Sequence, residues 1–390
     1  MVIVNIAPAA PYNDNWGYQE NLLPKYQLKL GNEVTVITTN LTHQNGGVAA
    51  IEPADYRLAD GERIIRLAYR RYPLPVLTNL FKKLEVYELL RSIRPDFIFC
   101  HGLISNTIFD VIRYVRRDNP RCVVVQDNHM DFNNRAEGAR ARKLVGKRYY
   151  RWLNRRSLPY VARVYGVTPR RKTYAEEYFG IPPAKTDVLL MGADDEKIDF
   201  ANRGRIRAEL RAKYGFADDD FVIVTGGKID PAKNITVLMR ACKNRKGVKL
   251  LVFGSLSEDV KQEFEAALAG AENIVYIGWL ASDQVYNYFF AADLVCFPGL
   301  HSVLWEQACA CKVPCLFHRL DGMEHVNNGG NSDFVSPVTE DTLREKVGEL
   351  LFTEQYERMR QAAQSEKTDI FLYSTIAEKS LECAEGAALC

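Results

Sequence analysis

Two kinds of segment alternate along most of this 390-residue chain: short runs of β-branched and apolar residues, and longer runs with helical periodicity. This alternation limits the possible folds severely. A strand, a helix and a second strand in succession form a crossover between parallel strands, and repeats of that unit build an α/β protein. Two such series occur, separated by the charged, Arg-rich segment 199–220, which we expect to contain a helix. The sequence therefore predicts two α/β halves with a boundary near residue 200.

The elements of the first half follow from these periods. Its predicted strands are Val2–Ile6, Glu33–Thr38, Ile64–Leu67, Phe97–Cys100, Val123–Gln126, Arg163–Val167 and Val188–Leu190. Its predicted helices are Gly17–Leu30, Val76–Ile93, Ser105–Arg117 and Lys143–Tyr160.

The second half has the same pattern. Its predicted strands are Phe221–Thr225, Lys249–Phe253, Ile274–Ile277, Leu294–Phe297 and Pro314–Phe317. Its predicted helices are Ile235–Cys242, Glu258–Ala269, Asp283–Ala291, Ser302–Cys311, Glu340–Leu351 and a last helical segment, Gln361–Glu385.

The composition excludes several classes of protein. The chain has no apolar run of the roughly 18 residues that a transmembrane helix needs. Its first residues lack the charged and long apolar regions of a signal peptide and are predicted to be a strand. The nine cysteines are odd in number and lie mostly in apolar segments, which indicates reduced core residues of a cytoplasmic protein. Cys309 and Cys311 lack the C-x-x-C spacing of zinc sites, so no metal is expected there.

The loop after the first predicted strand, Ala7–Gly17, bears on cofactor binding. A dinucleotide-binding loop would have the pattern G-x-G-x-x-G at this place, and Gly17 is the one glycine present. A nicotinamide or flavin enzyme is therefore disfavoured. Gly17 either permits close approach of a substrate or phosphate, or is simply a turn residue.

Polar residues follow two strands of the first half. Asp127, Asn128, His129 and Asp131 come directly after the strand that ends at Gln126. Because ligands of open α/β sheets bind at the carboxyl ends of strands, His129 is a candidate site residue, although a single histidine is often structural. His101, at the end of the preceding strand, is a weaker candidate for the same reason.

A glycine pair follows the first strand of the second half. Thr225–Asn234 contains Gly226 and Gly227, where a ligand can approach the backbone, and Lys228 and Lys233, which can bind phosphate as point charges. It is not a P-loop, since G-x-x-x-x-G-K-[ST] is absent. Surface lysines are the alternative interpretation.

A second candidate segment is Phe297–Val326, predicted as strand end, tight loop and helix. Ser302 is typical of an N-cap residue, and the amides of Ser302 and Val303 could serve a diphosphate. Glu306 is the one carboxylate between Asp293 and Asp321. It is either a favourable partner of the helix dipole or a ligand-binding group that accepts hydrogen bonds from ribose hydroxyls.

Several motifs together resemble the retaining glycosyltransferases of family 4, which have the GT-B architecture of two Rossmann-like, doubly wound domains that face each other across a cleft. In the second half they are Val224–Asn234, Val252–Gly254, Val275–Trp279, Ala291–Leu294, Ser302–Ala308 and Gly322–Val326. In the first half they are Gly17, Pro95-Asp96, the His129 loop, and Thr168-Pro169 through Met191–Asp194.

The resemblance implies sugar transfer from a nucleotide-sugar donor to an acceptor hydroxyl, with retention of configuration and without a metal or other cofactor. It implies that Lys228 and Lys233 neutralise the donor diphosphate and act with His129 as catalytic residues. The implied donor-binding residues are Gly17, Gly227, Lys228, Lys233, Trp279, His301, Ser302, Val303 and Glu306. Asp127, Asn128 and Asp131 are expected on the acceptor side.

One residue departs from the family pattern. The first of the family's paired glutamates, eight positions before Glu306, is replaced by Pro298. That glutamate contacts the donor sugar in the family, so the donor of this protein is expected to differ. His301 or Ser302 could supply the missing contact, and unchanged donor turnover in a His301→Ala variant would exclude His301.

The expected domains are an acceptor-binding domain, 1–198, a nucleotide-sugar-binding domain, 199–365, and a C-terminal helix, 366–390, that returns to the first. Lys and Arg far outnumber the one acid, Glu137, in the segment Arg135–Lys172. We expect this segment to contact anionic lipid at the inner face of the cytoplasmic membrane, where a lipid-linked glycan would be the acceptor. The alternatives are a helix that is simply solvated and a nucleic-acid-binding segment, which has the same composition. Of these, nucleic-acid binding is the less favoured, and no nucleic-acid partner is expected. Flotation with acidic liposomes, lost at high salt, tests this.

The predicted function is thus a glycosyltransferase of surface polysaccharide biosynthesis. The sequence leaves two alternatives open. One is a sugar-nucleotide epimerase of the same architecture, and the other is an inactive nucleotide-sugar-binding scaffold, which the replacement at Pro298 suggests.

Overall fold

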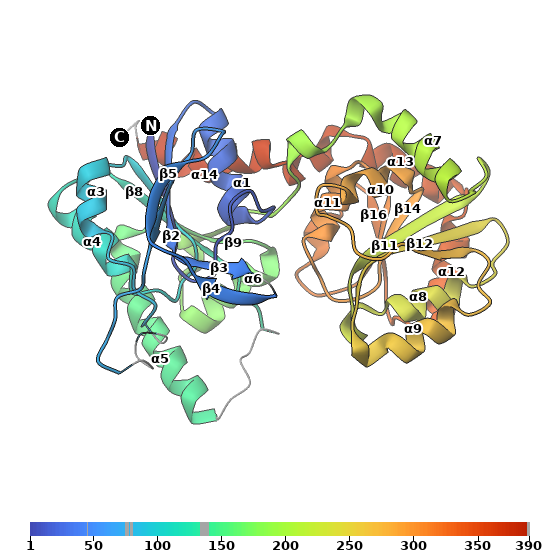
Figure 1. Ribbon diagram of the computed structural model, residues 1–390, viewed down its shortest axis with the longest axis horizontal. Helices are drawn as coiled ribbons and strands as arrows, with labels where there is room; N and C mark the ends of the chain where they lie inside the picture. Colours follow the sequence, from blue (N-terminus) through green and yellow to red (C-terminus); the bar gives the residue numbers. More distant parts are fainter. Residues whose placement is uncertain (45, 75–77, 79–80, 133–139, 388–390) are drawn as a thin grey trace. The chain divides into compact units, whose positions relative to one another are not determined.

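The computed structural model describes residues 1–44, 46–74, 78, 81–132 and 140–387, with the backbone alone at 140–145 and 385–387. The chain forms two compact units (Figure 1). Unit 1 comprises Met1–Leu190 and Tyr373–Cys390, and unit 2 comprises Met191–Leu372. Among the described residues, every helix is too short or too polar to span a lipid bilayer.

Unit 1 contains a large sheet with helices on both faces. The strands of this unit are β1 (Val2–Ala7), β2 (Glu33–Thr39), β3 (Leu41–Gln44), β4 (Gly47–Ala50), β5 (Ala54–Arg57), β6 (Arg63–Leu67), β7 (Phe97–Cys100), β8 (Val123–Asn128), β9 (Arg163–Gly166) and β10 (Thr186–Val188). Its α-helices are α1 (Gln19–Lys29), α3 (Tyr87–Ile93), α4 (Ile108–Arg117), α5 (Arg140–Ser157), α6 (Pro169–Tyr174) and α14 (Tyr373–Ala387). Its shorter helical segments are η1 (Leu158–Tyr160), η2 (Ala175–Phe179) and η3 (Pro183–Lys185).

The eight-stranded sheet of unit 1 has the order β10-β9-β8-β7-β1-β2-β6-β5, and β3 and β4 pair separately as a hairpin. All neighbours are parallel except β5 and β6, which are antiparallel. Alternate residues of β1 enter different cores: Val4 and Ile6 pack with α3 and α4, whereas Ile3 packs with α1 and α14. Both faces of the sheet are therefore buried, which is why its strands are almost continuously apolar.

Unit 2 has a smaller, fully parallel sheet of order β13-β12-β11-β14-β15-β16. Its strands are β11 (Phe221–Ile229), β12 (Val248–Leu256), β13 (Ile274–Tyr276), β14 (Leu294–Phe297), β15 (Cys315–His318) and β16 (Ser332–Val335). Its α-helices are α7 (Arg203–Lys213), α8 (Ile235–Cys242), α9 (Lys261–Leu268), α10 (Val285–Ala291), α11 (Leu304–Ala310), α12 (Glu340–Leu350) and α13 (Glu354–Ala363). Its shorter segments are η4 (Asp195–Lys197), η5 (Phe200–Asn202), η6 (Pro231–Lys233), η7 (Glu258–Val260), η8 (Glu324–Val326) and η9 (Glu366–Phe371). Figure 1 shows α8, α9 and α12 on one face of this sheet and α10 and α11 on the other.

The division between the units lies at residue 190 and not at residue 198. The reason is a set of backbone contacts that attach the next residues to unit 2. Ala193 pairs with Leu372 as an isolated bridge, and its N–H donates to Phe371 at 2.8 Å. The N–H of Asp194 donates to the hydroxyl of Tyr286 at 3.1 Å.

The C-terminal segment is also divided. The predicted helix over Gln361–Glu385 is interrupted between α13 and α14, and η9 belongs to unit 2. The return to unit 1 thus begins at Tyr373 and not at residue 366. There α14 packs beside α1, and the side chain of Gln27 donates to Ser380 at 2.9 Å (Figure 1).

Of the helix predicted over Val76–Ile93, residues 78 and 81 and α3 are helical, and the prediction is wrong for residues 82–86. Side chains elsewhere in unit 1 accept hydrogen bonds from backbone N–H groups of residues 82–86, which a helix would use internally. The N–H of Leu84 donates to Thr107 at 2.9 Å, and that of Val86 donates to Asp110 at 3.1 Å. Residues 76, 77, 79 and 80 lie outside the described part of the chain.

A buried acid before β6 leads to a first testable prediction. Glu62 is 4% exposed, and its Oε1 has no hydrogen-bond partner among the described residues. Burial, assisted by the charge of Asp60, raises the pKa of Glu62 to about 7 from 4.5. Since the folded pKa is the higher one, the native state loses stability as the pH rises from 4.5 through 7.

Glu62→Gln is therefore expected to leave the thermal unfolding midpoint nearly unchanged at pH 4 and to raise it at pH 8. The gain at pH 8 should correspond to about 1–3 kcal/mol, because each unit of pKa shift is worth about 1.4 kcal/mol. Glu33→Gln, at an exposed position, serves as the control and should have little effect at either pH. A Glu62→Gln variant that is less stable than the parent at pH 8 contradicts the prediction.

Candidate functional site

Each sheet reverses its strand order beside its first strand, and ligands of open α/β sheets bind there, outside the carboxyl ends of the strands. In unit 2 the reversal lies between β11 and β14, and in unit 1 it lies between β1 and β7. The segments that follow these strands are the loops that the sequence analysis selected. Each unit therefore has a candidate site of its own, and each is described by itself.

Three adjacent strands of unit 2 have glycines near or just after their carboxyl ends. Gly227 and Gly254 are register partners on β11 and β12, and a Cβ atom on Gly254 would lie 1.7 Å from the carbonyl oxygen of Gly227. The N–H of Gly254 donates to the carbonyl of Gly278, which follows β13, at 2.7 Å. Such a row of glycines lets a ligand approach the main chain closely. We call it the glycine edge.

Two exposed side chains flank the glycine edge. The Lys228 side chain is 69% exposed, and its ammonium lies 3.8 Å from the carboxylate of Asp230. Trp279, next to Gly278, is 72% exposed. A cation and an aromatic face are thus available beside bare backbone, and these groups suit phosphate and a planar base respectively.

Lys233 lies on the same side of the sheet but makes different contacts. Its ammonium donates to the carbonyl of Leu300 at 2.6 Å and to that of His301 at 3.3 Å. Burial lowers its pKa. A Cβ atom on Gly299 would lie 2.2 Å from the Cα of Lys233, so the loop after β14 packs directly on this segment. In this structure Lys233 fastens that loop, whereas Lys228 is available to solvent.

The carboxylate of Glu306 has no exposed surface, because two histidines enclose it. His301 Nε2 lies 2.8 Å from Oε1 and 3.0 Å from Oε2, and His325 Nε2 lies 2.8 Å from Oε1. Burial would raise the pKa of Glu306, but the two histidines outweigh it, and that pKa falls to about 2. The predicted ribose contact of Glu306 therefore requires at least one histidine to release the carboxylate.

The predicted N-cap role of Ser302 is wrong. α11 begins at Leu304, its N-cap residue is Val303, and no side chain caps the helix. The carbonyl of Ser302 accepts a hydrogen bond from the N–H of Trp305 at 3.0 Å. In the first turn of the helix, fully buried Trp305 stacks on Phe317 with 4.5 Å between the ring centroids.

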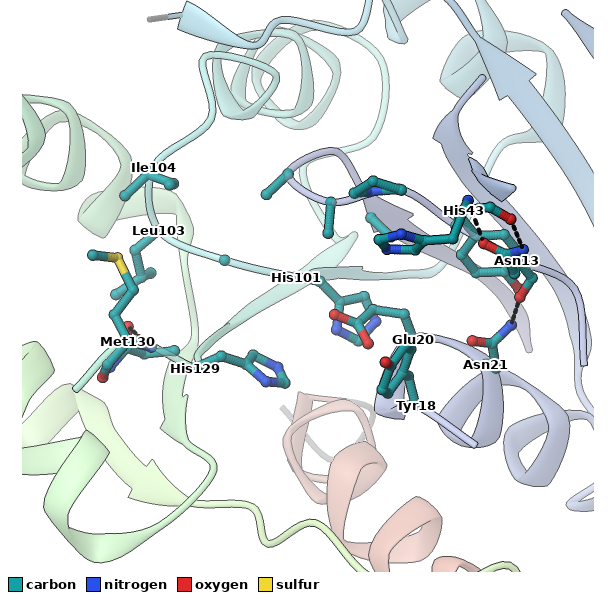
Figure 2. Close-up of a pocket in the computed structure, with 17 residues that line it drawn as sticks. Asn13, Tyr18, Glu20, Asn21, His43, His101, Leu103, Ile104, His129 and Met130 are labelled. Atoms are coloured by element: carbon teal, nitrogen blue, oxygen red, sulfur yellow. Dashed lines mark hydrogen bonds between the residues drawn. The ribbon is translucent and has the colours of Figure 1, made fainter. Parts of the chain in front are cut away.

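Unit 1 contains a cavity of about 410 Å³ at its reversal point. The segment after β1, the start of α1 and the loops after β7 and β8 line it (Figure 2). Its walls are mostly apolar, and Glu20, His43, His101 and His129 supply ionisable side chains. Gly17 is exposed and is not among the lining residues.

Asp127 contacts two of these histidines and does not itself line the cavity. It has no exposed surface; its Oδ2 lies 2.8 Å from His101 Nδ1 and 3.1 Å from His129 Nε2, and its Oδ1 accepts from the N–H of Gly102 at 2.8 Å. Burial would raise the pKa of Asp127, but the two histidines outweigh it and hold that pKa below its usual range. Burial likewise opposes the charged form of His129, yet Asp127 raises its pKa.

The other residues predicted near His129 have separate contacts. Asn128 lines the cavity, and its amide donates to the carbonyls of Met130 and Arg171, each at 2.9 Å. Asp131 lies 2.9 Å from the guanidinium of Arg170 and does not line the cavity. Glu20 was not predicted as a site residue, although its place in the first turn of α1 was a usable signal.

The basic segment Arg135–Lys172 is described in part. Arg135 lies outside the described residues, and the side chains of Arg140, Arg142 and Lys143 are not described. From residue 146 on, the described Lys and Arg side chains of α5 have no carboxylate within ion-pair distance in the described part of the chain. Arg151 instead donates to the backbone carbonyls of residues 177 and 178.

Comparison with known proteins gives the family. The family model described as "Glycosyltransferase Family 4" matches residues 23–197, and that described as "Glycosyl transferases group 1" matches residues 206–366. A D-inositol 3-phosphate glycosyltransferase of Mycobacteroides abscessus is 26% identical over 180 residues, 43% of this chain and 40% of the relative. A lipopolysaccharide 1,2-N-acetylglucosaminetransferase of Salmonella typhimurium is 24% identical over 192 residues, 44% of this chain and 49% of the relative. The match thus spans less than half the length of each relative.

Solved structures match over the whole chain. A glycosyltransferase from Rickettsia africae has a TM-score of 0.71 and 17% identity, covering 99% of this chain and 98% of that one. Anabaena HepE in complex with UDP has a TM-score of 0.67 and 15% identity, covering 99% of both chains. The fold predicted from the sequence is confirmed, and the chain belongs to the family 4, or group 1, glycosyltransferases with the GT-B fold.

Proposed function

We propose that this protein transfers a sugar from a nucleotide-sugar donor to a hydroxyl of a glycan or lipid-linked glycan, with retention of configuration, during synthesis of a surface polysaccharide. The observation that carries the proposal is the glycine edge of unit 2, with exposed Lys228 and Trp279 beside it. A diphosphate needs close backbone approach and a cation, and a nucleobase needs an aromatic or apolar face. Family membership and the UDP complex of a protein of like fold support it.

The donor binds along the glycine edge in this proposal. Lys228 contacts the diphosphate, and Trp279 stacks on the base. In the reaction the bond from the anomeric carbon to the diphosphate oxygen breaks, so negative charge develops on the departing nucleoside diphosphate. A bond from the anomeric carbon to the acceptor oxygen forms, and the proton of the acceptor hydroxyl passes to the departing diphosphate. Stabilising that charge is usually the largest catalytic contribution. Lys228 and Lys233, on the segment that follows the glycine edge, are the cations proposed to do so. No metal is required for this.

The acceptor binds in the cavity of unit 1, where His129 contacts it. The cavity volume of about 410 Å³ falls within the range of small-molecule sites, about 300–1,000 Å³. Its apolar walls with a few ionisable groups suit the pyranose ring and hydroxyls of a sugar. The polysaccharide context comes from the Salmonella relative, a lipopolysaccharide transferase by name.

A panel of UDP-, GDP- and other nucleotide sugars tests the proposal, with release of nucleoside diphosphate as the measurement. A transferase releases it from one donor, and faster with an acceptor. A sugar-nucleotide epimerase alters the sugar without any acceptor, and a scaffold releases nothing from any donor. Either of the last two outcomes overturns the proposal.

Lys228→Ala is expected to raise the dissociation constant for the matching nucleoside diphosphate about tenfold or more, since a hydrogen bond to a charged group contributes about 1.5–3 kcal/mol. Isothermal titration calorimetry measures this dissociation constant. The difference in affinity between the parent and Lys228→Ala should become smaller at higher salt, because salt screens the charge of Lys228. Lys261→Ala is the control: Lys261 is also exposed and paired with an acid of unit 2, at 3.5 Å from Glu258. Equal effects of the two substitutions would exclude a specific phosphate contact.

A further inference from the structure

The cavity of unit 1 brings together side chains that limit which acceptor it can take. One ring nitrogen or carboxylate oxygen from each of Glu20, His101 and His129 lies within 4.8 Å of the others. Figure 2 shows the three side chains directed to the same part of the cavity. We propose that the part of the acceptor bound here is a ring that presents hydrogen-bond donors, hydroxyl or ammonium, and carries no phosphate or other anionic group. This inference rests on the proposed function and narrows its acceptor class.

The first argument is the direction of the hydrogen bonds. Asp127 Oδ2 lies 2.8 Å from His101 Nδ1 and 3.1 Å from His129 Nε2. An ionised carboxylate only accepts hydrogen bonds, so each histidine donates an N–H to Asp127. The nitrogens left for an occupant of the cavity are therefore His101 Nε2 and His129 Nδ1, and the latter is available for the acceptor contact of His129. In a neutral imidazole the nitrogen that is left accepts a hydrogen bond.

The second argument is a buried nitrogen that lacks a partner. His101 is 3% exposed, and its Nε2 has no hydrogen-bond partner in the part of the chain that the structure describes. Native proteins rarely leave such an atom unpaired. His101 and Glu20 both line the cavity, and the Glu20 carboxylate also only accepts. Adjacent hydroxyl groups of a sugar, or an ammonium group, can donate to both.

The third argument is the charge of the cavity. The described residues that line it include Glu20 and three histidines but neither a lysine nor an arginine. Lys82 and Arg171 lie near the cavity, but they do not line it. If His129 is charged, the carboxylates of Glu20 and Asp127 still outnumber it. A phosphate would thus be buried beside like charges without a cation to pair with, which is costly.

The start of α1 does not offer an anion site instead. A helix N-terminus favours negative charge, but Glu20, in the first turn of α1, already places a carboxylate there. The N–H groups of Asn21 and Leu22 donate to the carbonyl of Tyr18, at 3.0 and 2.9 Å. The helix start therefore adds to the exclusion of a second anion.

Binding to the donor-free, full-length protein tests the inference. The probes are methyl glycosides of the common hexoses, methyl glucosaminide and myo-inositol, each compared with a phosphorylated counterpart such as glucose 6-phosphate, glucosamine 6-phosphate or myo-inositol 3-phosphate. Saturation-transfer NMR detects binding, and titration gives the dissociation constant. We expect at least one unphosphorylated probe to bind, and its phosphorylated counterpart to bind at least about tenfold more weakly. Tighter binding by the glucosaminide would identify an ammonium as the group at Glu20, and tighter binding by an uncharged probe would identify hydroxyls; both support the inference.

Glu20→Gln is expected to weaken binding of the unphosphorylated probe about tenfold, because it replaces a charged hydrogen-bond acceptor by a neutral one. It should also reduce the discrimination against the phosphorylated counterpart. Glu88→Gln is the matched control, since Glu88 is also an acid in the first turn of a unit 1 helix but is exposed and outside the cavity. It should change neither affinity, and circular dichroism confirms that both variants fold.

Three results would overturn the inference. They are a phosphorylated probe that binds as tightly as its counterpart, an absence of binding by every unphosphorylated probe, and an unchanged affinity in Glu20→Gln. Failure of the proposed function is seen separately, because release of nucleoside diphosphate from the donor panel without any acceptor does not depend on this cavity's choice of acceptor.

Discussion

Gly254→Ala is expected to lower the free energy of unfolding of unit 2 by about 4 kcal/mol or more, at the upper end of what single substitutions do. The added Cβ would lie 1.7 Å from the carbonyl oxygen of Gly227, and the φ of Gly254 is +127°. A side chain at such a φ costs about 1–3 kcal/mol by itself. The overlap adds to this, since both contacting groups are backbone and cannot rotate away.

Two other glycines of unit 2 separate these causes. Gly247 has φ +71°, and a Cβ atom added there would have nothing within 4 Å, so Gly247→Ala measures conformational strain alone, about 1 kcal/mol. Gly226 has no such φ, but its Cβ would lie 2.4 Å from the carbonyl oxygen of Phe253, so Gly226→Ala measures overlap alone. Urea unfolding of the three variants should rank Gly254→Ala as the least stable. A Gly254→Ala variant no less stable than Gly247→Ala would show that β11 and β12 are not held at this separation.

The same substitution bears on function. The glycine edge is where the donor is proposed to bind, so separation of β11 from β12 would displace Lys228 and Gly278 together. Any folded fraction of Gly254→Ala should therefore bind nucleoside diphosphate much more weakly than Gly247→Ala does. This comparison distinguishes damage to the site from a general loss of stability.

The sequence was most informative where burial alone decides the structure. The strand Phe97–Cys100 and the helix Ile235–Cys242 have the predicted bounds, because strands buried on both faces and helices with one buried face carry strong periodic signals. β3, β4 and β5 were not predicted: each has four residues, and they lie in a hairpin and on the sheet edge, where polar residues are tolerated. β16 was missed because Ser332 and Asp333 interrupt its apolar pattern.

The candidate site could be predicted as positions on a sheet edge but not as contacts. Strand ends indicated His129, Lys228 and Glu306, since parallel strands bring their carboxyl ends to one side. Some of the residues that they meet lie far along the chain: His325, which contacts Glu306, is in η8, and His101, which shares Asp127 with His129, follows another strand. No local spacing encodes such pairs.

The enclosed carboxylate of Glu306 leads to the last prediction. Glu306→Gln is expected to lower the free energy of unfolding by about 3 kcal/mol, because removing one partner of a buried ion pair typically costs about 3–5 kcal/mol. The amide offers one oxygen acceptor and one N–H₂ group, and the latter would face a histidine N–H donor. Glu345→Gln, an exposed acid on α12, is the control and should change little.

The pH dependence identifies the charge as the cause. The folded pKa of Glu306, about 2, is below the ordinary value of 4.5, so its contribution to stability is present above pH 4.5 and is lost as the pH falls towards 2. The difference between the parent and Glu306→Gln should therefore be constant from pH 7 to about 5 and shrink below 4.5. A constant difference down to pH 3 would attribute the loss to packing and not to the charge.

Nucleotide binding by the same variant decides what the carboxylate does in the donor site. A ribose hydroxyl could replace one histidine as a hydrogen-bond partner of the Glu306 carboxylate. In that case Glu306→Gln should raise the dissociation constant of the nucleoside diphosphate about tenfold in addition to destabilising unit 2. If the two histidines keep it, stability falls while the affinity of the folded protein is unchanged. The second outcome would remove Glu306 from the proposed donor contacts. It would also explain why Pro298 can stand in place of the family's first glutamate. The contacts of Glu306 with the two histidines would then hold the loop in position, whereas in the family the paired glutamates bind the donor.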